Sequence, residues 1–167
     1  MSDLEVNVAV ISKLAAPGTQ RHQDALAVLD ATRAVVARGW TQRTWFVMET
    51  PRGRRRLAQR FFPTRLDHRR VVEACLVGAV VHGAHRLSSR PEYAYPALDA
   101  LWNALFDAEA TGGVSGDPVG PLTPPLIRAA RVRDLTTWND RPYRTKQDVV
   151  RLIDLATARV GGARARV

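Results

Sequence analysis

The chain has 167 residues and a mass of 18.5 kDa, the size of one ordinary domain. Hydrophobic residues make up 46% and charged residues 25% of the chain, and these globular proportions exclude an intrinsically disordered protein. A single cysteine excludes an intramolecular disulfide and a cysteine-based zinc site. The longest apolar run, Ala74 to Val81, is far shorter than the roughly 18 residues of a membrane-spanning helix. With no secretion-signal pattern at the start, we expect a cytoplasmic protein that does not bind membranes.

The net charge of +9 is concentrated in one segment. Between Arg52 and Arg70 there are eight arginines and one acidic residue, Asp67, so this segment carries +7 and the rest of the chain +2. Nearly all basic residues are arginine, a bias that a GC-rich genome produces without selection for function. The position of the charge is therefore more informative than its total.

The first half of the chain predicts a helix and a hairpin. Residues 4–10 alternate at period two, so residues 1–18 are predicted to form a short strand or an ordered arm. Thr19 is the predicted cap of a helix that ends near Arg38, before Gly39. Residues 41–66 predict a basic β-hairpin, in which the turn Pro51–Arg54 leads to a return strand through Phe61 and Phe62.

A second predicted helix is capped by Asp67 and runs from about His68 to His85. Its centre is apolar on every face, which is typical of a central buried helix. We expect the core to contain Cys75, Leu76, Val80 and Leu152.

The second half predicts three further helices. The first starts near Ser89 or Pro96 and includes Leu98 to Phe106; the second runs from Pro125 to about Arg133; the last follows Thr145, with Asp148 completing its cap, and ends near Val160. Residues 111–125 form a loop rich in glycine and proline, and residues 135–144 are predicted to be irregular. The predicted fold is mainly α: a compact single-domain helical bundle of residues 19–160 with one β-hairpin, followed by a flexible basic tail at 161–167.

Trp138, Asn139 and Asp140, followed by Arg144, form the strongest cluster of candidate functional side chains. Asn and Asp bind nearby backbone groups, so the cluster can be a purely structural turn with Trp138 in the core. In the alternative interpretation it is a ligand site, with Asp140 as base or anchor, Asn139 as orienting donor and Arg144 as anion clamp.

Cys75 is a candidate nucleophile, if a histidine lies beside it. His82 and His85 are two to three helical turns further on, roughly 10 and 15 Å along the axis, so a base would have to come from His22 or His68. A cysteine in the middle of an apolar helix is usually a buried small hydrophobe. His82 and His85 could share a metal ion, but the sequence offers no third ligand in a recognised pattern, so we expect neither metal nor cofactor.

The arginine-rich hairpin is a candidate nucleic-acid site through Arg52, Arg54, Arg55, Arg56 and Arg60. Guanidinium groups bind phosphates, and the nearby Trp45, Phe46, Phe61 and Phe62 could stack on bases. The alternative is a solvated hairpin with apolar roots.

Three motifs resemble the pattern of a known family. They are Gly39-Trp40-Thr41-Gln42, Cys75-Leu76-Val77-Gly78-Ala79, and Trp138-Asn139-Asp140 followed by Arg144-Thr145. The pattern is that of an uncharacterised domain-of-unknown-function family of small actinobacterial and phage proteins, and the resemblance spans about Leu26 to Ala158. It implies an intracellular, mostly helical single domain with no established activity. The chain departs from the pattern between Trp45 and Arg70, where the family has a shorter, less basic linker.

Two hypotheses follow from these observations. In the first, the protein is a non-enzymatic accessory or regulatory protein whose hairpin binds nucleic acid or another polyanion. In the second, it is a small enzyme or ligand-binding protein, with a pocket of Trp40, Cys75, Trp138, Asn139, Asp140 and Arg144, in which Asp140, Asn139 and Cys75 would be catalytic. We favour the first, because the sequence offers no convincing nucleophile–base pair, metal set or cofactor loop. The oligomeric state is open.

Overall fold

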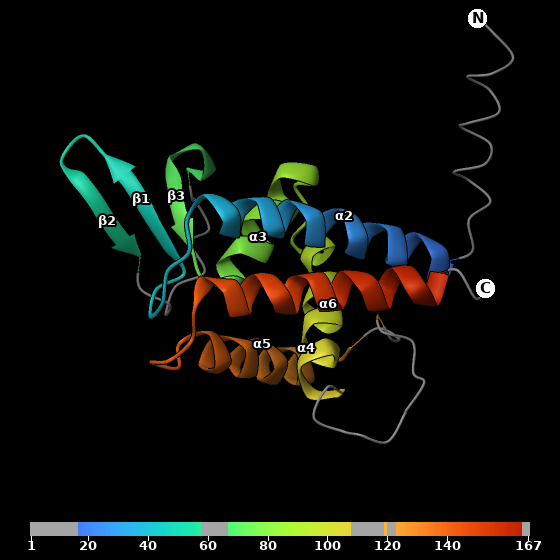
Figure 1. The fold of residues 1–167 in the computed structure, drawn as a ribbon. Coiled ribbons are helices and arrows are strands. Elements are labelled where there is room, and N and C mark those ends of the chain that lie inside the picture. The colour runs from blue at the N-terminus through green and yellow to red at the C-terminus, as the bar shows by residue number, and fades with distance from the viewer. Residues whose placement is uncertain (1–16, 58–66, 108–118, 120–122, 165–167) are drawn as a thin grey trace, which may run out of the picture.

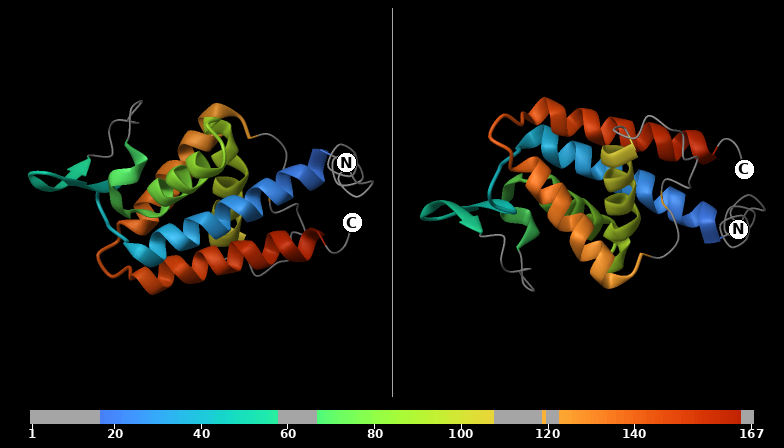
Figure 2. Two further views of the ribbon diagram at one scale, coloured as in Figure 1. Left: turned by 90° about the horizontal axis from the view of Figure 1, so that it is seen from above. Right: turned by 90° about the horizontal axis from the view of Figure 1, so that it is seen from below.

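Helix α2 (Pro17–Arg38) packs against three other helices in the computed structural model, which describes residues 17–57, 67–107, 119 and 123–164. Its partners are α3 (Leu76–Leu87), α4 (Tyr95–Asp107) and α6 (Lys146–Arg164), while α5 (Pro125–Asn139) packs on α3 and α4. Figures 1 and 2 show α2 and α6 side by side and antiparallel. The predicted mainly helical fold is confirmed. No helix in the described part of the chain is long and apolar enough to cross a membrane.

Helix α2 contributes one apolar face to the core. Ala25, Val28, Leu29 and Val36 are fully buried there, at the three- and four-residue steps of a helix face. The helix begins at Pro17, so Thr19 lies inside it and is not the predicted cap.

Three short strands form an antiparallel sheet at one end of the bundle. They are β1 (Phe46–Thr50), β2 (Gly53–Leu57) and β3 (Val71–Ala74), in the order β2-β1-β3. The predicted hairpin is confirmed as β1 and β2, with Gly53 at a φ of +101° in the turn, where glycine is favoured. Figures 1 and 2 show it extending away from the helices. Phe61 and Phe62, the predicted continuation of the return strand, lie outside the described residues.

The prediction of one helix from His68 to His85 is wrong in its first part. Asp67 caps only a 3-10 turn, η1 (His68–Arg70), and β3 follows it. The β-branched pair Val71 and Val72 favours a strand, and pairing with β1 satisfies the strand's backbone groups. Helix α3 therefore begins at Leu76, and Cys75 is its N-cap instead of a residue in its middle.

Helix α3 lies directly against β1. A Cβ added to Gly78 would come within 2.3 Å of the carbonyl oxygen of Trp45, so only glycine allows this approach. The Cys75 N–H donates to the same carbonyl oxygen at 3.1 Å. The predicted core is confirmed, since Cys75, Leu76 and Val80 are fully buried and Leu152 is 6% exposed.

Helix α5 is longer than predicted. It continues past Arg133 to Asn139, so residues 135–139, predicted to be irregular, are helical. Leu135 and Asn139 are both buried, and tertiary packing outweighs the low helix propensity of the two threonines between them. Before α4, the 3-10 turn η2 (Pro91–Ala94) occupies the segment near Ser89.

Helix α6 starts as predicted and ends later. The Thr145 N–H and hydroxyl donate to Asp148 at 3.0 and 2.8 Å, and the Asp148 N–H donates to the Thr145 hydroxyl at 3.2 Å. These bonds form a reciprocal cap and hold the pKa of Asp148 below its ordinary value. The helix runs through Gly161 and Gly162 to Arg164, past its predicted end near Val160 and into the segment predicted to be a flexible tail.

Candidate functional site

The three sequence motifs meet at the buried side chain of Asn139. Its Oδ1 accepts hydrogen bonds from the indole N–H of Trp40 at 2.9 Å and from the backbone N–H of Leu76 at 3.1 Å. Its Nδ2 donates to the carbonyl oxygen of Thr41 at 3.3 Å and to Oδ1 of Asp140 at 2.8 Å. We call these five residues the Asn139 network. It joins the end of α5 to the segment after α2 and to the start of α3.

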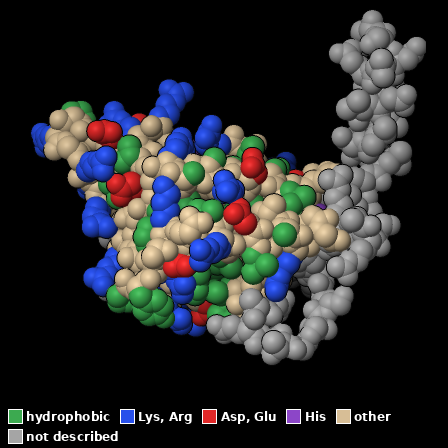
Figure 3. All heavy atoms as spheres, in the orientation of Figure 1, with side chains coloured by type: hydrophobic (Ala, Val, Ile, Leu, Met, Phe, Trp, Pro, Cys, Tyr) green, Lys and Arg blue, Asp and Glu red, His purple; other side chains and the backbone are tan. Residues whose placement is uncertain are grey.

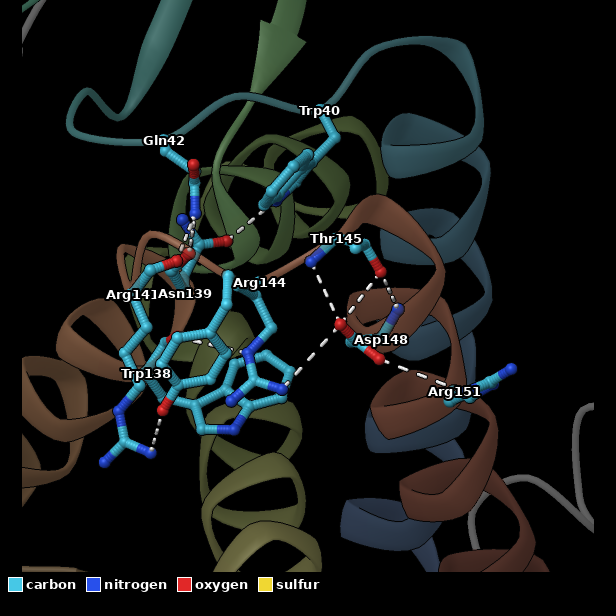
Figure 4. A network of polar contacts seen from close by, with 10 residues as sticks. Trp40, Gln42, Trp138, Asn139, Arg141, Arg144, Thr145, Asp148 and Arg151 are labelled. Carbon is cyan, nitrogen blue, oxygen red and sulfur yellow. Dashed lines mark hydrogen bonds and ion pairs between the residues drawn. The ribbon is translucent and has the colours of Figure 1, made fainter.

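Gln42 and Arg43 extend this network to the residues that follow α5. Figure 4 shows the bonds of Gln42. The Gln42 side-chain amide donates to the carbonyl oxygens of Asn139 at 2.8 Å and of Arg141 at 2.9 Å. The Arg43 N–H donates to Oδ1 of Asp140 at 2.8 Å, and Arg43 has a φ of 59°, in the left-handed region. Gln42 thus satisfies the carbonyl oxygen of Asn139, which the end of α5 leaves without an intrahelical partner.

The hydrogen bonds of Asn139 indicate a structural role. An amide side chain offers two acceptor sites and two donor hydrogens, and here all four are used by the protein itself. Asn139 is fully buried. It therefore has no hydrogen-bonding capacity left to orient a ligand.

Arg144 and Trp138 also bind each other. The Arg144 guanidinium lies 3.9 Å from the ring centroid of Trp138 and 5.6 Å from that of Tyr143. Its Nε donates to the carbonyl oxygen of Trp138 at 3.4 Å, and one Nη lies 3.9 Å from Asp148. The side chain is 14% exposed. Figure 4 shows the guanidinium against the ring of Trp138, which it covers. These contacts within the protein engage much of the group that was proposed to clamp an anion.

Cys75 directly precedes Leu76 of the Asn139 network in the chain and is fully buried. Its Sγ accepts a hydrogen bond from the Gly78 N–H at 3.4 Å, as the N-cap of α3. Burial raises the pKa of the thiol to about 12. At neutral pH the sulfur is protonated, and a protonated buried thiol is a poor nucleophile.

Three histidines from η1 and α3 lie together, an arrangement that the sequence did not predict. His68 Nδ1 is 2.9 Å from His82 Nδ1, and the rings of His68 and His85 stack with centroids 3.7 Å apart. Burial lowers the pKa of His68, and it lowers that of His82 to about 4. The sequence shows only the helical spacing of His82 and His85; the turn η1 adds His68. In the described residues, no group of three or more His, Cys, Asp or Glu side chains is arranged to hold a metal ion.

The arginines of the hairpin fall into two groups. Arg54 pairs with Glu73 at 2.9 Å, and Arg56 donates to the Thr41 hydroxyl and the Gln42 carbonyl, both at 3.1 Å. These two side chains brace the sheet against the segment that carries Trp40. Arg56 is therefore partly structural.

Arg52 and Arg55 form the second group. Both are exposed, and neither forms an ion pair with any residue that the structure describes. Arg55 stands opposite Met48 in the β1–β2 register, on the other face of β2 from Arg54. Arg60, the fifth arginine predicted to bind nucleic acid, lies outside the described residues.

The surface around the hairpin is basic but not uniformly so. Residues 40–57 and 67–74 contain seven arginines and three acidic residues, Glu49, Asp67 and Glu73. Figure 3 shows basic side chains at the hairpin end of the molecule and also over the helices, where acidic side chains lie between them. The local excess of positive charge is real, and Glu73 neutralises part of it.

A family model described as a family of unknown function (DUF6197) matches residues 20–159. This range contains all three motifs of the Asn139 network and both strands of the hairpin. No curated protein and no solved structure matches the chain. The predicted resemblance to an uncharacterised family is confirmed, and the actinobacterial and phage distribution stays a prediction.

Proposed function

The chain belongs to this family of unknown function, and from that premise we propose that it is a non-enzymatic accessory or regulatory protein of the cytoplasm that binds nucleic acid through its arginine-rich hairpin. The observation that supports the proposal most is the pair Arg52 and Arg55, exposed on a two-stranded ribbon that extends from the bundle (Figure 1). Arg54, 64% exposed although paired with Glu73, adds a third guanidinium within the same turn and strand.

The contacts would be mainly to phosphate. Trp45 is 7% and Phe46 1% exposed, so neither aromatic side chain is available to stack on bases as the sequence suggested. Guanidinium groups bind phosphate oxygens by charge-assisted hydrogen bonds, which carry no direct information about base sequence. We therefore expect binding with little sequence preference and strong salt dependence.

The candidate catalytic residues support a non-enzymatic role. The thiol of Cys75 is buried and protonated, and the Asn139 side chain forms all four of its hydrogen bonds with groups of the protein itself. Asp140 accepts from Asn139 and from the Arg43 N–H. Asn139 and Asp140 thus join the end of α5 to the segment after α2, and Cys75 caps α3.

The experiment is a binding titration across a salt series. Fluorescence anisotropy with labelled mixed-sequence duplex DNA, single-stranded DNA and RNA should show an affinity that falls as salt rises, with a log–log slope of about −0.9 per neutralised phosphate on duplex. The double variant Arg52→Gln/Arg55→Gln should reduce the magnitude of that slope by about one to two. Its unfolding midpoint should stay near that of the wild type, because both side chains are exposed.

A charge-matched variant serves as the control. Arg133→Gln/Arg151→Gln removes two exposed arginines from α5 and α6, which are not part of the hairpin, and should leave the slope nearly unchanged. If the wild type does not bind at low salt, or if both double variants lower the slope equally, the hairpin is not a nucleic-acid site. Binding of a polyanion such as heparin without binding of DNA or RNA would also overturn the proposal.

A further inference from the structure

A cavity of about 1030 Å³ opens between α3, α4 and α5, and neither the Asn139 network nor the described arginines of the hairpin line it. Apolar side chains from several elements line it, among them Phe46 on β1, Val77 and Val81 on α3, Leu98 on α4 and Val132 on α5. The volume is at the upper end of the roughly 300–1000 Å³ typical of small-molecule sites. The sequence did not predict it, because its walls come from segments up to 87 positions apart, Trp45 to Val132.

The polar groups of the cavity are basic or neutral. Arg90, Arg128, His68 and His85 line it, together with two serines and Tyr95, and no Asp or Glu is among the lining residues that the structure describes. An apolar chamber whose ionisable groups are cationic or neutral favours a ligand with an apolar body and a negative charge.

Arg128 is the most specific of these groups. Its guanidinium lies over the ring of Tyr95, 3.8 Å from the centroid, so the side chain is held in one position on the cavity wall. Its Nε is buried and has no hydrogen-bond acceptor among the described residues. A buried donor without a partner is costly, and a ligand carboxylate or sulfonate would supply the missing acceptor. Helix α5 starts at Pro125 in the same wall, so its positive dipole end adds to the attraction.

We propose that this cavity binds a small amphipathic organic anion, with the apolar part against Val81 and Leu98 and the anionic group on Arg128. This binding is separate from that of the hairpin and does not depend on it. An aromatic sulfonate or a carboxylate with a hydrocarbon body has the required chemistry.

The test compares two dyes that differ in charge. 8-Anilinonaphthalene-1-sulfonate and its neutral analogue N-phenyl-1-naphthylamine share an apolar body, and only the first has an anionic group. Fluorescence titration of the folded protein should give a tighter dissociation constant for the sulfonate. Arg128→Gln should weaken sulfonate binding about tenfold and change binding of the neutral dye by less than about twofold.

Two further variants make the test specific. Val81→Trp should weaken binding of both dyes by filling the chamber, and Ala129→Trp does so from an exposed position if the first variant fails to fold. Arg133→Gln, an exposed arginine on the same helix, should leave both dissociation constants unchanged. The proposal is overturned if the neutral dye binds as tightly as the sulfonate, if Arg128→Gln has no selective effect, or if neither tryptophan variant reduces binding.

Discussion

Replacing Asn139 by alanine tests the structural role of the Asn139 network. The substitution leaves the Leu76 N–H, which is fully buried, and the half-buried indole N–H of Trp40 without their acceptor. It also removes a donor from the buried carbonyl of Thr41. An unsatisfied buried polar group costs about 1–3 kcal/mol, with the lower value for Trp40, which water can approach, so we expect a total loss of about 3–5 kcal/mol. That is a large part of the roughly 5–15 kcal/mol that stabilises a typical domain.

Equilibrium unfolding in urea, followed by circular dichroism, measures this loss. The control is Thr137→Ala, two positions earlier on the same helix and exposed, which should change the free energy of unfolding by less than about 0.5 kcal/mol. A loss below about 1 kcal/mol for Asn139→Ala would refute the structural role of the network. It would leave Asn139 available as a ligand-orienting group.

Asn139→Asp checks the direction of the hydrogen bonds. The new carboxylate would face the Thr41 carbonyl and the Asp140 carboxylate, both of which are acceptors. Its charged form is therefore disfavoured in the folded state, so its folded pKa lies above the unfolded value of about 3.9. The variant should lose more stability at pH 7 than at pH 4.5, each relative to the wild type at the same pH.

Three further perturbations have expected outcomes. Gly78→Ala should destabilise the fold by at least about 2 kcal/mol in urea unfolding, because its Cβ would meet the Trp45 carbonyl oxygen at 2.3 Å. Asp140→Ala should cost about 1–3 kcal/mol by thermal unfolding, since Oδ1 accepts from Asn139 and from the Arg43 N–H. Burial lowers the pKa of His82 from 6.5 to about 4, so the unfolded state binds more protons between these values. The unfolding midpoint of the wild type should therefore fall as the pH is lowered from about 6.5 to about 4, and His82→Gln should flatten that dependence.

Matched controls separate these effects from general damage. Gly161→Ala places a methyl group on α6 with nothing within 4 Å and should be neutral or stabilising, in contrast to Gly78→Ala. An unchanged midpoint for Asp140→Ala would favour the ligand-site interpretation of that residue. A midpoint that does not depend on pH between 6.5 and 4 would show that His82 is not buried in its neutral form.

The helices were predictable where one face is apolar and a cap is present. Helices α2 and α6 have apolar residues at helical spacing, and the capping pattern of Thr145 and Asp148 predicts the start of α6. The stretch from Val71 to Leu87 lacks such contrast. Apart from Glu73, its residues from Val71 to Val81 are apolar, so periodicity could not separate the strand β3 from α3, and only the pairing with β1 does so.

The residues of the candidate site were predictable from the sequence, but their structural role was not. The sequence identified Trp40, Asn139 and Asp140, yet the choice between a turn and a pocket depends on partners 97 to 99 positions away. Those distances in sequence are closed by the packing of α2, α3 and α5. The cavity lined by Arg128 could not be predicted from the sequence either, because its wall is assembled from several segments that only the folded chain brings together.

The most direct test of the hairpin as a nucleic-acid site is an NMR titration of the uniformly ¹⁵N-labelled protein with a short mixed-sequence DNA duplex at low salt. If the hairpin binds phosphate, the amide signals of residues 50 and 52–57 and the side-chain Nε–H signals of Arg52 and Arg55 should shift, and the amide signals of residues 146–160 on α6 should not. The shifts should disappear as salt is raised. Shifts centred on α6 or on Arg128, or no shifts at all, would contradict nucleic-acid binding at the hairpin.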